Sequence, residues 1–328
     1  MTDDRLLILI PIYNDWEAAA MLLPALDRAL AGAALRARVL LVDDGSTAAV
    51  GAALGDQRYG AIELVEILRL RRNVGHQRAI AIALAYVQDQ VKPAAVLVMD
   101  GDGEDAPEDV PRLAAKLRES GGTAIVFAER RRRSESIPFR VFYGLYRFVH
   151  WLLTGIPVRV GNFSIVPSAQ LERLVVVSEL WNHYAAAVFK SRVPRDTVPT
   201  VRATRLCGQS RMNFVALVAH GLSALSVHAE LIGVRLLVLT TAIVSLVVVA
   251  IVAVLTIKFA TPLAIPGWAT TAIGFLLVIL FQAIAFAGVF AFLVLHARSQ
   301  PLFIPLRDYP HFVSRVQSVS PVVNVTMS

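Results

Sequence analysis

Four carboxylates follow an apolar stretch near the middle of the chain. The stretch 94–99 is apolar, and Asp100, Asp102, Glu104 and Asp105 come directly after it. Acids two residues apart at the end of a strand repel one another unless a cation joins them, and a hard divalent ion prefers oxygen ligands. Because Mg²⁺ or Mn²⁺ completes its shell with waters and phosphates, the pattern predicts a metal and diphosphate site at the first three acids.

The spacing excludes an EF-hand and gives the fourth acid a different role. An EF-hand loop needs glycine at its sixth position and glutamate at its twelfth, and these positions hold Asp105 and Pro111. Asp105 and Glu108 instead have capping-box spacing, with Pro107 in the first turn, which predicts that Asp105 caps a helix. The glycines at 101 and 103 favour a tight loop that a ligand can approach closely.

The first 130 residues alternate between strand and helix patterns. Apolar, β-branched runs predict strands at about 6–12, 39–43, 62–68, 95–99 and 123–128, and helical patterns fall between them at about 16–31, 76–90 and 107–119. This alternation predicts an α/β fold with a mostly parallel, doubly wound sheet. Ligands bind such sheets outside the carboxyl ends of the strands, where the polar stretches "PIYND", "DDGST", "RRNVGH" and "DGDGED" occur.

Two long apolar stretches lie in the C-terminal third. The chain has 328 residues, 56% of them hydrophobic, and Leu236–Ile257 and Ala269–Leu295 carry no charge. Each stretch is long enough to cross a hydrocarbon core of about 30 Å as a helix. The sequence therefore predicts an integral membrane protein with two transmembrane helices.

Charge and cysteine content limit the compartment and the partners. Arg235 precedes the first span and Arg298 follows the second, whereas the connection carries only Lys258, which predicts that both termini lie in the cytosol. The N-terminus has acids where a signal peptide needs bases, and the single cysteine, Cys207, fits a reducing compartment. With membrane spans present, a net charge of +7 favours anionic lipid or a phosphate substrate over nucleic acid.

Five stretches resemble, in order, the motifs of family 2 glycosyltransferases with the GT-A fold. They are "IPIYND", "VLLVDDGST", "LRRNVGHQRAIAIAL", "VLVMDGDGEDAPED" and "RLCGQSRMNF". With two C-terminal spans, the chain resembles the polyprenyl-phosphate branch of that family. The resemblance implies a nucleotide-sugar donor and a polyprenyl-phosphate acceptor. It also implies that catalysis takes place at the cytosolic face of a bacterial inner membrane, in the synthesis of a cell-envelope glycan.

The resemblance also implies roles for single residues. Pro11, Tyr13 and Asp15 would line the nucleotide pocket, and Asp44 would reach the base or ribose while Asp43 supports the turn. Asn73 and Gly75 match an Asn-x-Gly turn ahead of a helix, where His76 is either a first-turn residue or a catalyst; Asn14 is either a helix cap, with Glu17, or a ligand. Asp100 and Asp102 match the family's paired acids, and Glu104 stands where glutamine is frequent.

Basic residues are predicted to bind the acceptor. Arg130 begins a run of four arginines that is either a solvated face or a phosphate site, and Arg140 lies in a predicted amphipathic helix at 137–154 in the membrane interface. The pattern of Arg205, Gly208, Ser210 and Arg211 resembles the family's Arg-x-x-Gly-x-Ser-basic loop, with juxtamembrane charge as the alternative for Arg211. These arginines would bind the diphosphate or the acceptor phosphate.

The predicted mechanism follows from a missing base. A hydroxyl acceptor needs a general base, and the comparable stretch "GNFSI" offers Asn162, which cannot take a proton. A lipid monophosphate is largely ionised near neutral pH and attacks unaided, giving one inverting displacement. The alternatives are a hydroxyl-directed transferase, a polysaccharide synthase, which needs a QxxRW motif that the sequence lacks, and a membrane scaffold without activity.

The sequence predicts three parts. Residues 1–228 would form the cytosolic catalytic domain, including the interfacial helix, residues 229–298 the two-helix membrane domain, and residues 299–328 a cytosolic tail. The tail has no recognisable motif, and we consider self-association as one role for it.

Overall fold

The computed structural model describes residues 3–50, 54, 57–130, 137–156, 160–207, 214–262, 265–299 and 303–319. The chain divides into two compact units. The sheet unit comprises residues 1–144, 158–227 and 302–328, and the helical unit comprises residues 145–157 and 228–301. The division differs from the expected boundaries, because the C-terminal segment belongs to the sheet unit and the second half of the helix at 137–154 belongs to the helical unit.

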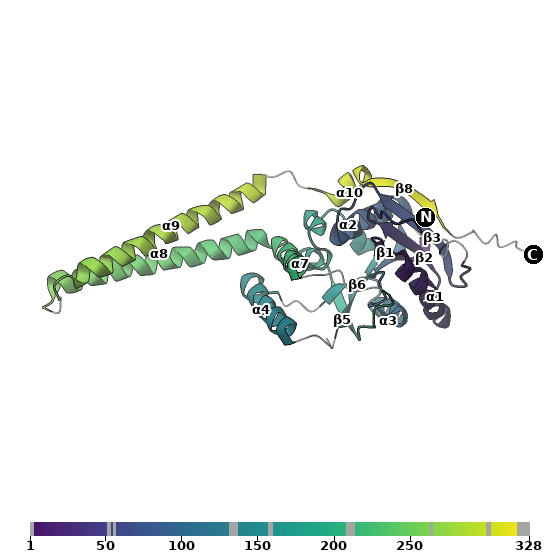
Figure 1. The fold of residues 1–328 in the computed structure, drawn as a ribbon, viewed down its shortest axis with the longest axis horizontal. Coiled ribbons are helices and arrows are strands. Elements are labelled where there is room, and N and C mark those ends of the chain that lie inside the picture. The colour runs from purple at the N-terminus through teal and green to yellow at the C-terminus, as the bar shows by residue number, and fades with distance from the viewer. Residues whose placement is uncertain are drawn as a thin grey trace, which may run out of the picture. The chain divides into compact units, whose positions relative to one another are not determined.

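A single mixed sheet forms the centre of the sheet unit (Figure 1). Its eight strands have the order β7-β5-β6-β4-β1-β2-β3-β8. Neighbours are parallel in the pairs β1–β2, β1–β4, β2–β3 and β5–β7, whereas β6 runs antiparallel to β4 and β5, and β8 runs antiparallel to β3. The strands are β1 Asp3–Ile12, β2 Ala37–Asp43, β3 Ile62–Leu70, β4 Pro93–Val98, β5 Ile125–Arg130, β6 Val160–Pro167, β7 Arg195–Thr200 and β8 Val313–Ser318.

Helices cover both faces of this sheet, and the alternation of side chains in β1 shows why. Leu7 and Leu9 belong to one buried cluster, with residues of α2, whereas Ile8 and Ile10 belong to the other, with residues of α1 and α3. All four side chains are at most 1% exposed, so β1 is a strand buried on both faces, as a doubly wound sheet requires. The helices of this unit are α1 Trp16–Gly32, α2 His76–Tyr86, α3 Val110–Glu119, α5 Ser168–Leu174, α6 Tyr184–Lys190, α7 Phe214–Ser226 and α10 Pro305–Asp308.

The segment after the second long helix returns to the sheet. β8 pairs with β3, with Leu68 opposite Val316, and the N–H of Arg71 donates to the carbonyl of Phe312 over 2.8 Å. The ring of Trp181 packs against Phe303 at 4.0 Å between centroids. Residues 303–319 thus form part of the sheet unit rather than a separate tail, and the predicted self-association remains a prediction.

Two long helices dominate the helical unit. α8 spans Ala229–Ala260 and α9 spans Trp268–Ser299, and both are long and apolar enough to cross a membrane. Only 11% and 6% of their most apolar windows are buried, so they are not core helices of a soluble fold. They pack closely along each other, since a methyl group on Gly233 would lie 2.5 Å from Val294.

Helix α4, Ile137–Thr154, differs in part from the predicted amphipathic pattern. The spacing of three and four from Arg140 through Arg147, His150 and Thr154 predicts one polar face. His150 and Thr154 are instead 3% and 4% exposed and bond to each other, whereas Trp151 and Leu152 are more than half exposed. The Arg235 guanidinium donates to the carbonyls of Leu152 and Leu153 at the C-terminal end of α4. Arg235 therefore satisfies helix carbonyls within the helical unit, in addition to adding charge beside the span.

The predicted strands and helices of the first 130 residues are present within a few residues, but neither predicted cap forms. The N-cap of α1 is Asp15, not Asn14, and the N-cap of the 3₁₀ turn Pro107–Asp109 is Ala106, not Asp105. Asn14 accepts the N–H groups of residues 47 and 48 instead, and Asp105 accepts the N–H of Asp100 within its own loop.

Candidate active site

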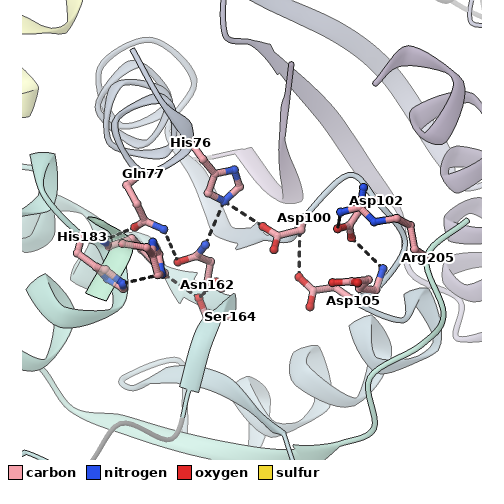
Figure 2. A network of polar contacts seen from close by, with 12 residues as sticks. His76, Gln77, Asp100, Asp102, Asp105, Asn162, Ser164, His183 and Arg205 are labelled. Atoms are coloured by element: carbon pink, nitrogen blue, oxygen red, sulfur yellow. Dashed lines mark hydrogen bonds and ion pairs between the residues drawn. The ribbon is translucent and has the colours of Figure 1, made fainter. Parts of the chain in front are cut away.

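One edge of the sheet collects the polar strand ends. The parallel strands β1, β2 and β4 end at this edge in Ile12, Asp43 and Val98, and the acidic loop follows β4. Because β6 runs antiparallel to β4, with Ser164 opposite Val98, Asn162 near its beginning lies at the same edge. Figure 2 shows Asn162 and Asp100 both in contact with the same ring nitrogen of His76.

The acidic loop at 100–105 is held by its own carboxylates and by close packing. The N–H of Asp100 donates to Oδ2 of Asp105 over 3.0 Å, and the N–H of Glu104 donates to Oδ1 of Asp102 over 3.0 Å. Asp105 is 3% exposed, so its carboxylate closes the loop from inside instead of capping the next helix. Gly103 has φ of +81°, and a methyl group there would lie 2.4 Å from Leu206, so this position requires glycine.

Two arginines from the segment after β7 lie over the acidic loop. Nη2 of Arg205 is 2.6 Å from Oδ2 of Asp102, and Arg202 pairs with Glu104. The main chains also bond, since Leu206 N–H donates to the Asp102 carbonyl and Ala203 N–H donates to the Glu104 carbonyl. Residues 202–206 are therefore fixed against the acids by side-chain and main-chain contacts.

His76 contacts the first acid. Its Nε2 lies 3.1 Å from Oδ1 of Asp100, and His76 begins α2 directly after the turn at Asn73–Gly75. Burial favours the neutral imidazole and lowers the pKa of His76, but the nearby carboxylate of Asp100, helped by Asp102 and Asp105, outweighs this effect and raises the pKa. The three carboxylates therefore favour the protonated form of the His76 imidazole.

A chain of hydrogen bonds links His76 to the buried side of the sheet unit (Figure 2). The main-chain N–H of Tyr184 donates to Oε1 of Gln77 over 2.7 Å, and Nε2 of Gln77 donates to Oδ1 of Asn162 over 3.1 Å. Nδ2 of Asn162 then lies 3.0 Å from Nε2 of His76. Behind this chain, His183 and His220 approach to 3.3 Å between their Nε2 atoms, and burial lowers the pKa of His220.

The acids after β2 hold neighbouring loops together. Both oxygens of Asp44 accept main-chain N–H groups, from Val74 at 2.7 Å and Gly75 at 2.9 Å, and Oδ1 of Asp43 accepts the N–H of Ser46. Burial raises the pKa of Asp44, although its two main-chain hydrogen bonds act in the opposite direction. Both acids therefore support turns in this structure, and a contact of Asp44 with a base or ribose remains a prediction.

The expected nucleotide-binding residues lie on the loops of this edge. Pro11 is buried in β1, Tyr13 is 42% exposed, and Oδ2 of Asp15 is 3.9 Å from Nη1 of Arg205. Asn73 is exposed, and Gly75 has φ of +94°. Asn14 has φ of +53°, and its Oδ1 accepts the N–H groups of residues 47 and 48, so it joins the loops after β1 and β2.

Several predicted acceptor residues fall outside the described part of the structure. The backbone of Arg130 ends β5 and that of Arg140 lies in α4, but their side chains are not described, and Gly208, Ser210 and Arg211 lie outside the described residues altogether. Their roles remain predictions. Of the predicted basic loop, Arg205 is described, and it lies at the acids.

The acids fit a divalent ion in part. In the part of the chain that the structure describes, no group of three or more His, Cys, Asp and Glu side chains is arranged to hold a metal. Glu104 pairs with Arg202 in this structure, so its predicted role as a third metal ligand remains a prediction. Asp100 and Asp102 remain, and one or two carboxylates are what Mg²⁺ uses when phosphates and waters supply its other ligands.

Sequence reasoning missed Arg202, Gln77 and the contact between His76 and Asp100. Arg202 precedes Arg205 by three positions, which is a visible signal. The partners of Gln77 lie 85 and 107 positions away, so no local pattern could have identified them.

Comparisons with known proteins identify the family of the N-terminal half of the chain. Residues 7–169 match the family model of glycosyl transferase family 2. This part of the chain is therefore a family 2 glycosyltransferase domain, and its sheet has the GT-A fold.

Its relatives include membrane-lipid sugar transferases. The chain is 25% identical over 217 residues to undecaprenyl-phosphate 4-deoxy-4-formamido-L-arabinose transferase of Klebsiella pneumoniae, covering 64% of this chain and 63% of the relative. It is 30% identical over 129 residues to the enzyme of that name from Erwinia tasmaniensis, covering 39% and 38%. The chain thus spans less than two thirds of the length of the curated relatives that it matches.

A solved structure shares the fold. Glucosyl-3-phosphoglycerate synthase from Mycobacterium tuberculosis, in complex with Mn²⁺, uridine-diphosphate-glucose and phosphoglyceric acid, matches with a TM-score of 0.50 and 15% identity, over 70% of this chain and 80% of that one.

Proposed function

We propose that the protein transfers a sugar from a UDP- or GDP-sugar to a polyprenyl phosphate, with inversion at the anomeric carbon and with a divalent metal ion. The observation that carries the proposal is the edge of the family 2 domain where Asp100 and Asp102 meet His76 and Arg205. The similarity to undecaprenyl-phosphate sugar transferases supports the choice of acceptor.

The donor would lie across the carboxyl ends of β1, β2 and β4. Pro11, Tyr13 and Asp15 would line the nucleotide side, and Asn73 and Gly75 form a turn at the same edge. Asp100 and Asp102 would hold Mg²⁺ or Mn²⁺, which would stabilise the negative charge that develops on the departing nucleoside diphosphate.

Arg205 lies where it can change partner during the reaction. In this structure its guanidinium contacts Asp102 and approaches Asp15. A diphosphate at the acids would offer the guanidinium a bidentate partner of matching geometry. Arg205 would thus stabilise the leaving group, and Arg130, Arg140, Ser210 and Arg211 are proposed to bind the acceptor phosphate.

The acceptor needs no base in this mechanism. A phosphate monoester has a second pKa of about 6, so an ionised oxygen is present near neutral pH. That oxygen forms a bond to the anomeric carbon while the bond from this carbon to the diphosphate oxygen breaks. The electron pair leaves with the nucleoside diphosphate, and the single displacement inverts the centre.

A second acceptor class has one observation in its favour. The pair of His76 and Asp100 resembles a base held by a carboxylate, which a hydroxyl acceptor would need. The similarity to relatives named for undecaprenyl phosphate favours the phosphate acceptor instead.

Product analysis tests the proposal. The purified full chain is incubated in detergent with polyprenyl phosphate and a panel of UDP- and GDP-sugars, with Mg²⁺, Mn²⁺ or EDTA, and the lipid products are identified by mass spectrometry. A polyprenyl-phosphate sugar that forms only with a divalent ion supports the proposal. A sugar linked to a hydroxyl, or product formation that EDTA leaves unchanged, contradicts it.

We further propose that the sheet unit faces the cytosol of a bacterial inner membrane. Sugar nucleotides are made in the cytosol, and Arg298 follows the second span while the connection carries only Lys258. Reporter fusions after Ser328 and within the connection 258–268 should report opposite sides. A C-terminal reporter outside the cell contradicts the orientation.

A further inference from the structure

We propose that Asn162 is an acceptor-binding residue whose amide orientation is set by Gln77, so that an N–H donor, and not an oxygen, faces the acceptor beside Asp100. The proposal rests on the proposed function and adds to it how the site selects an anion over a hydroxyl group.

The orientation follows from one group that cannot change its role. The main-chain N–H of Tyr184 can only donate, and it lies 2.7 Å from Gln77, so the Gln77 oxygen must face it. The other end of Gln77 is then its NH₂ group, which donates to an oxygen of Asn162 over 3.1 Å. The NH₂ group of Asn162 is left on the opposite side, toward His76.

The surroundings hold this chain in place. Tyr184 is fully buried, and its hydroxyl lies 2.7 Å from Oγ of Ser164, which donates to the carbonyl of Asn162. Gln77 is 8% exposed. Turning either amide over would place two donors or two oxygens against each other at a buried contact, so the orientation of Asn162 is determined by the fold.

The NH₂ group of Asn162 can serve a ligand as well as His76. It carries two N–H groups and lies 3.0 Å from Nε2 of His76, which accepts one of them only when Nε2 carries no proton. When Nε2 carries a proton, it donates instead to Oδ1 of Asp100 at 3.1 Å, and both N–H groups of Asn162 are left for a ligand. Asn162 is therefore a donor within reach of the acids, on the side of the sheet edge formed by β6.

The chemistry of the acceptor explains why a donor is placed here. An attacking hydroxyl group must lose its proton to an acceptor atom, whereas an attacking phosphate brings an ionised oxygen and unpaired lone pairs. An N–H group can hydrogen-bond the ionised phosphate oxygen, but it cannot take the proton that an attacking hydroxyl group must lose. Hydrogen bonds to charged groups contribute about 1.5–3 kcal/mol, which is roughly 10-fold to 150-fold in binding.

Gln77→Glu tests the orientation without changing Asn162. One oxygen of the glutamate still accepts from Tyr184, and the other faces Asn162, so Asn162 must turn its NH₂ group toward residue 77 and its oxygen toward the acceptor. Asn162→Asp presents an oxygen directly and serves as the second variant if Gln77→Glu does not fold. Gln170→Glu is the matched control, since Gln170 is 7% exposed and donates to the carbonyl of Thr123 through Nε2 in another part of the sheet unit.

Two measurements on the full chain in detergent decide the outcome. The first is the dissociation constant of citronellyl phosphate, with citronellol as the uncharged control; the second is the KM for polyprenyl phosphate together with kcat and the nucleotide dissociation constant. We expect both variants to weaken citronellyl phosphate binding and raise the acceptor KM by about 10-fold to 100-fold. Nucleotide binding should change less than about twofold, and Gln170→Glu should leave both acceptor values unchanged.

The two proposals can fail separately. Citronellyl phosphate binding within about threefold of the parent in the folded variants overturns the role of Asn162, even if the parent makes the expected lipid product. Equal losses of nucleotide and acceptor binding overturn it as well, because they indicate general distortion. If the parent makes no polyprenyl-phosphate sugar but binds citronellyl phosphate through Asn162, the proposed function fails and the anion site remains.

Discussion

The loops after β2 and β4 both begin with closely spaced acids at the same sheet edge, yet their carboxylates have different partners. Asp43 has a side chain 5% exposed that Arg69 approaches to 3.7 Å, and Asp43 and Asp44 accept main-chain N–H groups from neighbouring turns. The side chains of Asp100 and Asp102 are 28% and 15% exposed and contact His76 and Arg205, and Asp102 also accepts the N–H of Glu104. The buried carboxylates after β2 hold loops together, whereas the more exposed carboxylates after β4 can exchange their side-chain partners for a ligand.

The largest expected effect separates the two loops by activity. Asp102→Asn keeps the shape of the side chain but removes a charge that a metal ion requires, so turnover should fall by at least about 100-fold, or about 2.7 kcal/mol. Asp43→Asn is the control, since its Oδ1 can still accept from Ser46. Transfer of labelled sugar to polyprenyl phosphate measures both. Comparable turnover in the two variants would contradict the different roles of the loops.

Stability should separate the loops in the opposite direction. Asp44→Ala leaves the N–H groups of Val74 and Gly75 without their acceptor at a position that is 3% exposed. Leaving a buried group unsatisfied costs about 1–3 kcal/mol, so the free energy of unfolding should fall by that amount or more. Denaturant unfolding in detergent measures this change. An unchanged unfolding midpoint would show that the turn at residues 73–75 does not depend on Asp44.

The two arginines over the acidic loop should differ in their effect on catalysis, because they pair with different acids. Arg205 contacts Asp102 and approaches Asp15, whereas Arg202 pairs with Glu104, whose role as a metal ligand remains a prediction. Arg205→Ala should lower kcat/KM about tenfold, equivalent to about 1.4 kcal/mol, and Arg202→Ala should lower it less. Steady-state kinetics with varied donor provide the test. A larger loss of kcat/KM from Arg202→Ala than from Arg205→Ala would indicate that Glu104, the partner of Arg202, takes part in the reaction.

The smallest effect concerns the fourth acid. Asp105 accepts the N–H of Asp100 inside the loop, and asparagine can accept the same bond through its oxygen. Asp105→Asn should therefore cost a few tenths of a kcal/mol in stability with activity retained, whereas Asp105→Ala should cost about 1–3 kcal/mol. Thermal unfolding of both variants measures the difference. Equal costs would mean that the carboxylate charge, not the accepted hydrogen bond, holds the loop.

Local patterns predicted much of this molecule because they depend on neighbours in sequence. Alternating apolar residues in β1 and the acids after β4 follow from the period of a strand and from the edge at which parallel strands end. Helix caps were less certain, because Asn14 and Asp105 have the right spacing but find better partners at residues 47–48 and 100. A side chain near a helix start can bond to any N–H that the fold brings close.

The contacts that the sequence did not reveal join distant segments. Gln77 meets Asn162 and Tyr184 only because antiparallel β6 begins where parallel β4 ends and because α6 packs beside α2. Arg202 reaches Glu104 across 98 positions. Such pairs depend on the register of whole strands, which no single stretch of residues encodes.

The return of β8 to the sheet affects how a soluble form of this protein could be made. A chain cut after Val227 would lose both apolar helices but also the strand that covers β3. The uncovered edge of β3 would present a row of unpaired N–H and C=O groups, which favours aggregation. A soluble form should instead replace residues 228–301 with a flexible polar linker and keep residues 303–319, because the sheet unit is continuous in space and interrupted in sequence.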